Sequence, residues 1–321
     1  MNVTVHTNVV PPEVEPLCAL PDASFFHSPR WFAAVIAAHP AWRSGALVAR
    51  DAARVVQGAI PFVQASRFGL RRVYAGPWGT YGGIVARTPD ATQALTAALR
   101  QFASAASVAV VRIHDFAGVG TAGVATARHW THFEERCQVL DLGSDPRALF
   151  HDACTAKNRN KIRKAEKRGI RVRCARDAQA LQTYARLYRA SIGRRAAHAT
   201  PLALFTALAD AGDAVQVWLA ERDGQPVAAL LNLRCGGQIM NWGNVSLPES
   251  WPDAPNNLLH WRALESACGD AAGPRLYNFG SSAGLPGVHT FKASFGAREH
   301  VYDRLEYVAP WMAWWRRSRG A

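Results

Sequence analysis

The spacing of hydrophobic and polar residues in the first half of the chain predicts a helix, a set of strands and a second helix. Residues 29–39 place apolar side chains at helical intervals, whereas the segments that follow are short, rich in β-branched residues and separated by turn residues. Residues 88–106 begin at a capping-type Thr88 or Asp90 and carry Ala and Leu at helical spacing. The strands predicted in this half are 45–50, 54–64, 71–76, 107–114 and 136–142.

The second half begins with one long helical stretch and then continues in the same manner. Residues 145–168 form the predicted helix, with Pro146 near its first turn and Gly169 as a natural C-terminal stop. Residues 214–244 predict three antiparallel strands, because glycine-containing turns separate them. The other predicted elements are strands at 170–175, 275–280 and 299–308 and helices at 177–192, 201–211, 254–270 and 287–296.

Both halves therefore carry a helix, an antiparallel meander, another helix and further strands. This order predicts an α+β protein with two tandem domains, each a mixed and mostly antiparallel sheet flanked by helices. The expected domains are residues 1–144 and residues 145–321, and the second begins with the long helix. Because no low-complexity linker separates the halves, we expect them to pack against each other with a cleft between them.

A basic segment, KNRNKIRKAEKRGIRVR at residues 157–173, stands out from the otherwise mixed distribution of charge. Nine of its seventeen residues are Lys or Arg, and Glu166 is its only acid. On a helix the cations form an outer arc, and Cys154, Ile162 and Ala165 form a narrow apolar stripe that would face the protein.

This segment has two interpretations, a solvated surface helix or a helix that contacts a phosphate-rich ligand or nucleic acid. We favour the second, because few acids relieve the repulsion between cations four residues apart. The residues predicted to bind the phosphates of a donor or an RNA are Lys157, Arg159, Lys161, Arg163, Lys164, Lys167 and Arg168.

The composition supports a sizeable core and a polyanionic partner. The chain has 321 residues, 49% of them hydrophobic, and a formal net charge of +13, so it should attract nucleic acid, phosphorylated substrates or anionic lipid. Its six cysteines include no C-x-x-C pair, which argues against a zinc cage or a close-spaced disulfide framework and favours free thiols in a reducing compartment. The first residues lack the pattern of a secretory signal, and no run of eighteen apolar residues occurs. We therefore expect a cytoplasmic protein without a membrane span.

Three short motifs match known ligand or membrane sites only in part. Residues 118–123 fit G-x-G-x-x-G, but the parallel βαβ context of a dinucleotide site is missing. The segment also approaches the pyrophosphate loop of acetyl-CoA-dependent enzymes, but the carboxylate of Asp115 would repel the pyrophosphate. We therefore interpret it as a glycine-rich surface loop. His129 and His132 have no further ligand to complete a metal site, and no metal is expected. The segment WMAWWRRSRG near the C-terminus fits a helix packed on its own domain, which we favour, or peripheral contact with a membrane.

Several segments occur together in an order that resembles a known family. The first half contains FHSPRWFAAV, GAIPF and WGTYGGIV, and the second contains RNKIRKAEKRGIRV, DGQPVAALLNL, NWGN, NNLLHW, YNFGSS and FKASFG. Over about residues 25–308 this series resembles the FemA/FemB/FemX-like branch of the GNAT acyltransferase superfamily. The resemblance implies two tandem GNAT-like domains and transfer of an acyl or aminoacyl group to an amine. Some members of the branch use aminoacyl-tRNA to build peptidoglycan bridges.

The resemblance also implies roles for individual residues. The Phe-Lys pair of the branch falls on Phe291 and Lys292, where the lysine would stabilise the donor and the tetrahedral oxyanion. Where the branch more usually has Asp-Phe-Gly, this chain has Asn278, and the carboxylate that would orient the acceptor is therefore missing. The residues expected to bind substrate are Trp78, Tyr81, Trp242, Asn244, Asn257, Tyr277, Asn278, Phe279, Gly280 and Ser281.

We therefore expect an amide-forming transferase with no bound cofactor. Aminoacyl-tRNA is slightly favoured over acyl-CoA as donor, because of the basic segment, the net charge and the lack of a recognisable CoA loop. The acceptor is expected to be an amine of a small molecule or of a cell-wall precursor. No residue stands out as the general base, so a water or the hydroxyl of the donor could take the proton. The alternatives are an acyl-CoA-dependent N-acyltransferase and a non-catalytic RNA- or membrane-binding protein on the same fold.

Overall fold

The computed structural model describes residues 1–192, 200–270 and 273–312. It forms two compact units, one made of Met1–Glu135 with the segment from Val301 onward, and the other of Arg136–His300. Each unit has its own hydrophobic core.

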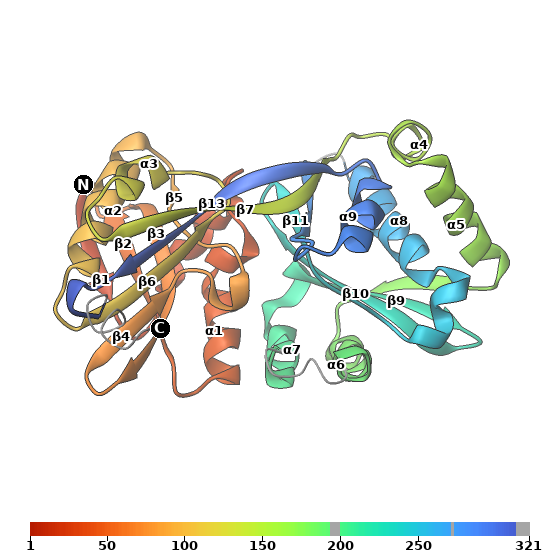
Figure 1. The fold of residues 1–321 in the computed structure, drawn as a ribbon, viewed down its shortest axis with the longest axis horizontal. Helices are drawn as coiled ribbons and strands as arrows, with labels where there is room; N and C mark the ends of the chain where they lie inside the picture. Colours follow the sequence, from red (N-terminus) through yellow and green to blue (C-terminus); the bar gives the residue numbers. More distant parts are fainter. Residues whose placement is uncertain (193–199, 271–272, 313–321) are drawn as a thin grey trace. The chain divides into compact units, whose positions relative to one another are not determined.

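The first unit contains an antiparallel meander, a crossover helix and two further strands (Figure 1). Its strands are β1 (Asn2–His6), β2 (Arg43–Arg50), β3 (Val56–Arg67), β4 (Leu70–Tyr74), β5 (Val85–Ala86) and β6 (Val108–Asp115), with parts of β7 (Trp130–Asp141) and β13 (Arg298–Val308). Its helices are α1 (Pro29–Ala38), α2 (Pro89–Ala103) and α3 (Thr121–Ala125), with the 3-10 turns η1 (Pro12–Ala19), η2 (Phe25–His27) and η3 (Pro77–Gly79).

The sheet of the first unit is covered on both faces along β2. Leu47 and Ala49 belong to the core against α2, and the alternate residues Ala46 and Val48 are also fully buried on the opposite face, where α1 contacts β2. Helix α2 begins where the sequence predicts, because the Thr88 hydroxyl accepts a hydrogen bond from the backbone N–H of Ala91 (3.2 Å). β6 runs parallel to β4 after this helix, and β13 pairs antiparallel with β6.

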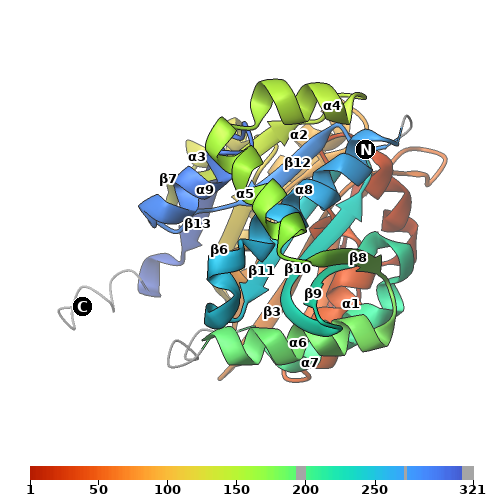
Figure 2. The ribbon, with the colours of Figure 1, turned by 90° about the vertical axis from the view of Figure 1, so that its right-hand side faces the viewer.

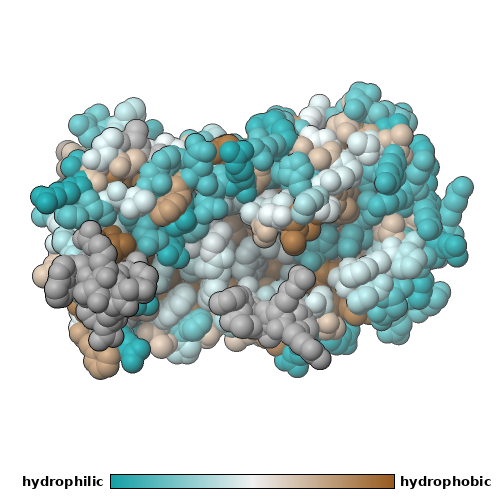
Figure 3. Space-filling model, in the orientation of Figure 1, coloured by the Kyte–Doolittle hydropathy of each residue, from teal (hydrophilic) through white to brown (hydrophobic). Residues whose placement is uncertain are grey.

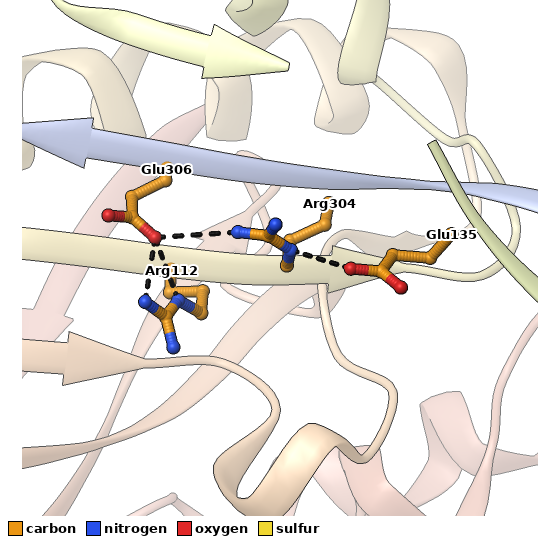
Figure 4. A network of polar contacts seen from close by, with 4 residues as sticks. All are labelled: Arg112, Glu135, Arg304 and Glu306. Atoms are coloured by element: carbon orange, nitrogen blue, oxygen red, sulfur yellow. Dashed lines mark hydrogen bonds and ion pairs between the residues drawn. The ribbon is translucent and has the colours of Figure 1, made fainter. Parts of the chain in front are cut away.

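A network of ion pairs joins β6, β13 and β7 in the first unit (Figure 4). Arg112 donates two hydrogen bonds to Glu306 (2.7 and 2.9 Å), Arg304 lies 3.5 Å from the same carboxylate, and Arg304 also donates to Glu135 (2.8 Å). The Arg304 guanidinium lies over the ring of Phe133, 3.8 Å from its centroid. Because Glu306 and Arg304 are largely screened from solvent, the network should stabilise this strand pairing more than isolated surface pairs would.

The glycine-rich segment forms a loop that folds around the carboxylate of Asp115. Gly118 and Gly120 have φ angles of 70° and 82°, and backbone N–H groups at 117–119 donate to that carboxylate. Burial raises the pKa of Asp115 to about 8. Nearby, His132 Nε2 lies 2.6 Å from Asp303 Oδ1. Of the C-terminal WMAWWRRSRG segment, all but its first two residues lie outside the described ranges.

The second unit repeats the plan of the first. Its strands are β8 (Arg171–Ala175), β9 (Val215–Arg222), β10 (Gln225–Cys235), β11 (Gln238–Ser246) and β12 (Leu276–Gly280), with parts of β7 and β13. Its helices are α4 (Pro146–Ala148), α5 (Ala156–Lys167), α6 (Ala178–Ile192), α7 (Leu202–Ala207), α8 (Pro255–Cys268) and α9 (Pro286–Ala293), with the π turn η4 (Leu149–Ala153) and the 3-10 turns η6 (Leu208–Ala214) and η7 (Pro248–Asp253).

The strand pairings confirm that the two halves are variations on one α+β unit. β8, β9, β10 and β11 form an antiparallel meander, β12 follows α8 and runs parallel to β11, and β7 pairs antiparallel with β12. The first unit has the same arrangement. Its meander is β1, β2, β3 and β4, its helix is α2, and β6 and β13 take the places of β12 and β7. The last strand of each unit therefore comes from the other half of the chain. This exchange is why the compact units differ from the contiguous division expected at 144/145.

The long helix predicted for residues 145–168 is wrong, because it is interrupted at Cys154 and Thr155. The chain there is extended (ψ of 130° and 150°), and the Thr155 N–H donates to the carbonyl of Ser294 (2.9 Å) instead of to a helix carbonyl. The Thr155 hydroxyl then caps a new helix, α5, by accepting from the N–H of Asn158 (3.3 Å). A long-range contact thus overrides a continuous helical pattern.

Helix α5 packs against α8 along the predicted apolar stripe (Figure 2). Cys154, Ile162 and Ala165 are buried in the core of the second unit, which confirms the orientation derived from the sequence. The space-filling view is hydrophilic over this helix, as its cations require (Figure 3). In the described ranges, none of the helices is both long and apolar enough to cross a bilayer.

Candidate active site

Two neighbouring cavities lie around helix α9 in the second unit. Their volumes are about 290 Å³ and about 740 Å³, and both are lined by Gly287 and Phe291. The smaller cavity is also lined by Asn241, Asn244, Asn256, His260, Val288 and Lys292. The larger is also lined by Thr155, Lys157, Asn158, Lys161, Asn257, Pro286, Thr290, Ala293 and Ser294.

Lys292 is held at the smaller cavity by two backbone carbonyl groups. Its Nζ donates to the carbonyl oxygens of Gly280 and Ser281, both at 2.8 Å, and the residue is only 7% exposed. Burial lowers the pKa of Lys292 to about 8. A protonated lysine has three N–H groups, so one remains for a ligand after these two bonds.

The end of β12 provides this pair of carbonyl groups. Gly280 has a φ angle of 73°, a left-handed conformation that turns the chain directly after the strand. The side chain of Asn278 fixes the turn, because its Oδ1 accepts from the N–H of Gly280 (2.8 Å). A side chain at Gly280 would also approach Met240, with a Cβ-to-Cε distance of 3.1 Å. Glycine therefore adopts this turn without the backbone strain that a side chain would add.

His260 forms the buried aromatic end of the smaller cavity. Its ring is surrounded by those of Phe279, Phe291 and Phe295, with centroid distances of 5.2 to 5.6 Å. Burial first, and then the charge of Lys292, lower the pKa of His260 to about 3, so the imidazole is neutral. Its Nε2 lies 2.9 Å from Asn244 Nδ2.

Two residues that line the smaller cavity have buried polar atoms without a protein partner in the described part of the chain. Within the described residues, no hydrogen-bond partner reaches His260 Nδ1 or Asn256 Oδ1, although both atoms are buried. Unsatisfied buried polar groups are costly, and a ligand or ordered water would relieve that cost. None of the described residues that line either cavity is an acid, so both favour anionic or neutral polar groups.

The wall of the larger cavity is fixed by a buried amide network at the start of α5. Asn158 is 1% exposed, and its Nδ2 donates to the carbonyl of Ser294 (3.1 Å). Asn257, from the first turn of α8, donates to Asn158 Oδ1 (2.8 Å). These bonds join α5, α8 and the end of α9, and they place Lys157 and Lys161 at the cavity.

The arginines and lysines of α5 differ in their surroundings. Arg159 donates to the carbonyls of His151 and Cys154, Arg163 lies over the ring of Phe150, and Arg168 lies 3.9 Å from Asp253. The lysines are exposed and, among the described residues, have no ion-pair partner; they are Lys157, Lys161, Lys164 and Lys167. The lysines, more than the arginines, are therefore available to a ligand.

The structure brings together only part of the predicted site. Asn244, Asn257, Phe291 and Lys292 line the two cavities, and Gly280 and Ser281 contribute their carbonyl groups. Tyr277, Asn278 and Phe279 are buried in the core beneath them, and the half-buried Trp242 packs against Phe205. Trp78 and Tyr81 belong to the first unit, where Trp78 packs beside Trp42 and Tyr81 beside Tyr302.

Sequence reasoning did not identify the buried His260 or the three other amides, Asn158, Asn241 and Asn256. No local pattern separates these residues from ordinary packing residues. One signal was available, however. The chain has only five lysines against 32 arginines, and the five are Lys292 and the four of α5. Four of the five lysines therefore lie on one helix, and the fifth is the residue to which the resemblance assigns the catalytic role.

Comparison with known proteins places the candidate site within a recognised domain. Residues 153–293 match the family described as Acetyltransferase (GNAT) domain, and this range contains every residue that lines the smaller cavity and all of those that line the larger one except Ser294. No curated protein matches the sequence.

Solved structures with the same fold cover nearly the whole chain. FemX has a TM-score of 0.78 at 14% identity, covering 98% of this chain and 99% of its own. A lysylphosphatidylglycerol synthetase C-terminal domain from Agrobacterium fabrum has a TM-score of 0.58 at 11% identity, covering 94% and 92%. A tandem GNAT protein from the clavulanic acid pathway has a TM-score of 0.55 at 16% identity, covering 96% and 98%. Residues 153–293 therefore match a GNAT acetyltransferase domain, and the chain as a whole has the fold of FemX and of a tandem GNAT protein.

Proposed function

We propose that this acyltransferase forms an amide by transferring an aminoacyl group from aminoacyl-tRNA to an amine. The observation that carries the proposal is the arrangement of lysines around the paired cavities. Lys157 and Lys161 line the larger cavity, Lys292 lines the smaller one, and Phe291 lines both. If Lys157 and Lys161 hold phosphates in the larger cavity, only the Phe291 side chain would separate these phosphates from a reacting carbonyl group at Lys292 in the smaller cavity.

The cavities suit a reaction without a covalent enzyme intermediate. An amine that attacks an activated ester needs a fixed geometry, a cation or N–H groups beside the developing oxyanion, and a proton acceptor. Lys292 supplies the cation, and the aromatic cluster around His260 excludes water from its neighbourhood. Asn244 and Asn256, at the same cavity, would orient the polar end of the acyl group or the acceptor.

The character of α5 supports tRNA as the donor. A helix with four unpaired lysines and few acids is costly unless an anion neutralises it, and an RNA strand supplies several phosphates at once. Proteins of similar fold include FemX and a protein named for the synthesis of lysylphosphatidylglycerol, a lipid that carries an amino acid. The acceptor of this chain is proposed to be an amine of a small molecule or of a cell-wall precursor.

The experiment compares donors and then tests the cavity lysines. Purified protein is incubated with a panel of amines and with either bulk aminoacylated tRNA or a set of acyl-CoA thioesters, and amide products are detected by mass spectrometry. We expect product from aminoacylated tRNA. Product from acyl-CoA alone would favour the acyl-CoA-dependent alternative, and product from neither would favour a non-catalytic binding protein.

A pair of variants on the same helix tests the proposed phosphate contacts. The variant Lys157→Gln/Lys161→Gln removes two cavity lysines, and Lys164→Gln/Lys167→Gln is the matched control with the same loss of charge outside both cavities. The cavity variant should reduce the log–log salt slope of tRNA binding by about 1.4, since each contact with single-stranded RNA contributes about 0.7. Its Michaelis constant for charged tRNA should rise more than its turnover falls. Equal slopes for the two variants would contradict a specific role for the cavity lysines.

A further inference from the structure

We propose that Gln138 of β7 is a positioning residue for Lys292, because its side-chain amide holds the segment after β12 and helix α9 in one fixed arrangement. The Gln138 Oε1 accepts a hydrogen bond from the hydroxyl group of Ser282 (2.6 Å), and its Nε2 donates to the carbonyl oxygen of His289 (3.1 Å). Ser282 directly follows the two carbonyl groups that hold Lys292, and His289 lies one turn before Lys292 on α9. This inference rests on the proposed function, in which Lys292 is the cation beside the reacting carbonyl group.

The segment after β12 needs such an anchor because it leaves the sheet. The pairing of β12 with β7 shifts register just before Gly280, which lies opposite Gln138. The chain turns at Gly280, and residues 281–285 are mostly exposed. Within this segment the Leu285 N–H donates to the Ser282 carbonyl (2.9 Å), a local bond that does not attach the segment to the sheet. The Gln138 side chain therefore continues, beyond the last strand pair, the attachment that the backbone ladder provides within β12.

Burial makes both ends of the Gln138 amide specific for these two elements. Gln138 is only 2% exposed, and its neighbours on β7, Cys137 and Val139, are buried as well. A buried amide is costly unless its nitrogen and its oxygen are both hydrogen-bonded. The carbonyl of His289 can only accept, so the amide nitrogen must face α9, and the amide oxygen is left to accept from the Ser282 hydroxyl. One buried group therefore sets the spacing between α9 and the segment after β12.

Lys292 depends on both of the elements that Gln138 holds. Its backbone belongs to α9, whereas its Nζ donates to the carbonyl oxygens of Gly280 and Ser281 at the end of β12 (both 2.8 Å). If α9 moved relative to this segment, these two bonds would lengthen and the ammonium group would lose its fixed place at the smaller cavity. Because a misplacement of about 1 Å can reduce a rate about 100-fold, loss of the Gln138 amide should reduce turnover more than it weakens binding of the donor.

The test replaces Gln138 with methionine and makes the same change at a matched glutamine of the first unit. Methionine fits a buried position but makes neither of the two hydrogen bonds. The control is Gln64 of β3, which is 7% exposed and donates from Nε2 to the carbonyl of Thr7 (2.7 Å). Gln64→Met should lower the melting temperature to a similar extent without affecting Lys292. Ser282→Ala, at a half-buried residue, removes only one of the two bonds and decides the question if circular dichroism shows that Gln138→Met does not fold.

One arm observes Lys292 without any substrate. Replacing the four lysines of α5 with arginine leaves Lys292 as the only lysine in the chain, and these positions are exposed, so folding should be preserved. With ¹⁵N-labelled lysine, NMR near pH 6, below the lowered pKa of Lys292, measures how fast its ammonium protons exchange with water. Exchange should be at least about tenfold faster in Gln138→Met than in Gln64→Met, and Ser282→Ala should lie between them, because a hydrogen-bonded proton exchanges only when its bond opens. Equal exchange rates in the two methionine variants, or wild-type exchange in Ser282→Ala, would overturn the inference.

A second arm measures transfer with aminoacylated tRNA and the amine panel. Gln138→Met should reduce kcat about tenfold or more while changing the Michaelis constant for charged tRNA less than about twofold, and Gln64→Met should change neither by more than about twofold. An unchanged kcat in a folded Gln138→Met variant would also refute the positioning role. If the wild type forms no amide but protection of the Lys292 protons still depends on Gln138, the proposed function alone is contradicted and the arrangement around Lys292 stands.

Discussion

Replacing Asn158 with alanine should weaken the attachment of α5 to α8 and to the end of α9. The Asn158 amide is almost fully buried, donates to the Ser294 carbonyl (3.1 Å) and accepts from Asn257 Nδ2 (2.8 Å). The Ser294 oxygen keeps a second partner, the Thr155 N–H, but the Asn257 donor would be left buried without one. Each lost bond costs about 1 kcal/mol and the stranded donor about 1 kcal/mol more, so the free energy of unfolding should fall by roughly 3 kcal/mol.

Asn160 offers a matched control, because it is the same residue type on the same helix but is exposed. Asn160→Ala should change the free energy of unfolding by less than about 0.5 kcal/mol, since a surface substitution on a helix removes no buried contact. Urea denaturation measures both variants, and amide hydrogen exchange shows whether α5 opens before the rest of the second unit. A double variant that also carries Asn257→Ala should recover about 2 kcal/mol relative to the sum of the single changes, because the shared hydrogen bond is lost only once and no Asn257 donor is left stranded. Equal stability of the Asn158 and Asn160 variants would refute the amide network as the anchor of α5.

Two other expectations concern pH and the turn that holds Lys292. Acid should destabilise the protein as pH falls from about 6.5 toward 4, because burial lowers the pKa values of His27, His114 and His260 to about 4, 4 and 3, and only the unfolded state takes up protons on these side chains in that range. Each histidine contributes about 1.4 kcal/mol per pH unit, and the raised pKa of Asp115, about 8, offsets one of the three because the folded state already holds that proton. Thermal unfolding from pH 7.5 to 4.5 tests the resulting net loss of about 2.8 kcal/mol per pH unit. Gly280→Ala should lower the free energy of unfolding by about 1 to 2 kcal/mol, because its backbone is left-handed, and should also reduce transfer by shifting a carbonyl group away from Lys292. Gly284 has a similar φ of 72° and open space around it, so Gly284→Ala should lose stability without losing kcat. Stability that does not change with acid, or equal kcat in the two glycine variants, would contradict the respective argument.

The proposed reaction places different demands on the two kinds of cation in the second unit. On α5, arginine side chains hold the helix to its neighbours through carbonyl, aromatic and carboxylate contacts, while lysines stay open to solvent. At Lys292 the ammonium group is removed from water and held by backbone carbonyls alone. The same residue type therefore serves as an exposed point charge on α5 and as a buried cation at Lys292, where burial lowers its pKa to about 8.

Much of the architecture was determined by the sequence. The helices 29–39, 88–106 and 254–270 and the meander within 214–244 were predicted from spacing and correspond to α1, α2, α8 and β9 to β11, because local periodicity and capping decide where such elements form. The inward stripe of α5 followed from the same periodicity. The family resemblance also identified Phe291 and Lys292, and both of these residues line the smaller cavity.

Only the tertiary structure decided how these elements combine. The break before α5 depends on the carbonyl of Ser294, about 140 residues away, so no local pattern could reveal it. The exchange of β7 and β13 depends on pairing between strands from the two halves of the chain. Packing removes His260 and Lys292 from water and so lowers the pKa of both side chains. Burial and long-range hydrogen bonds are properties of the folded chain, and the chemistry of this site arises from them.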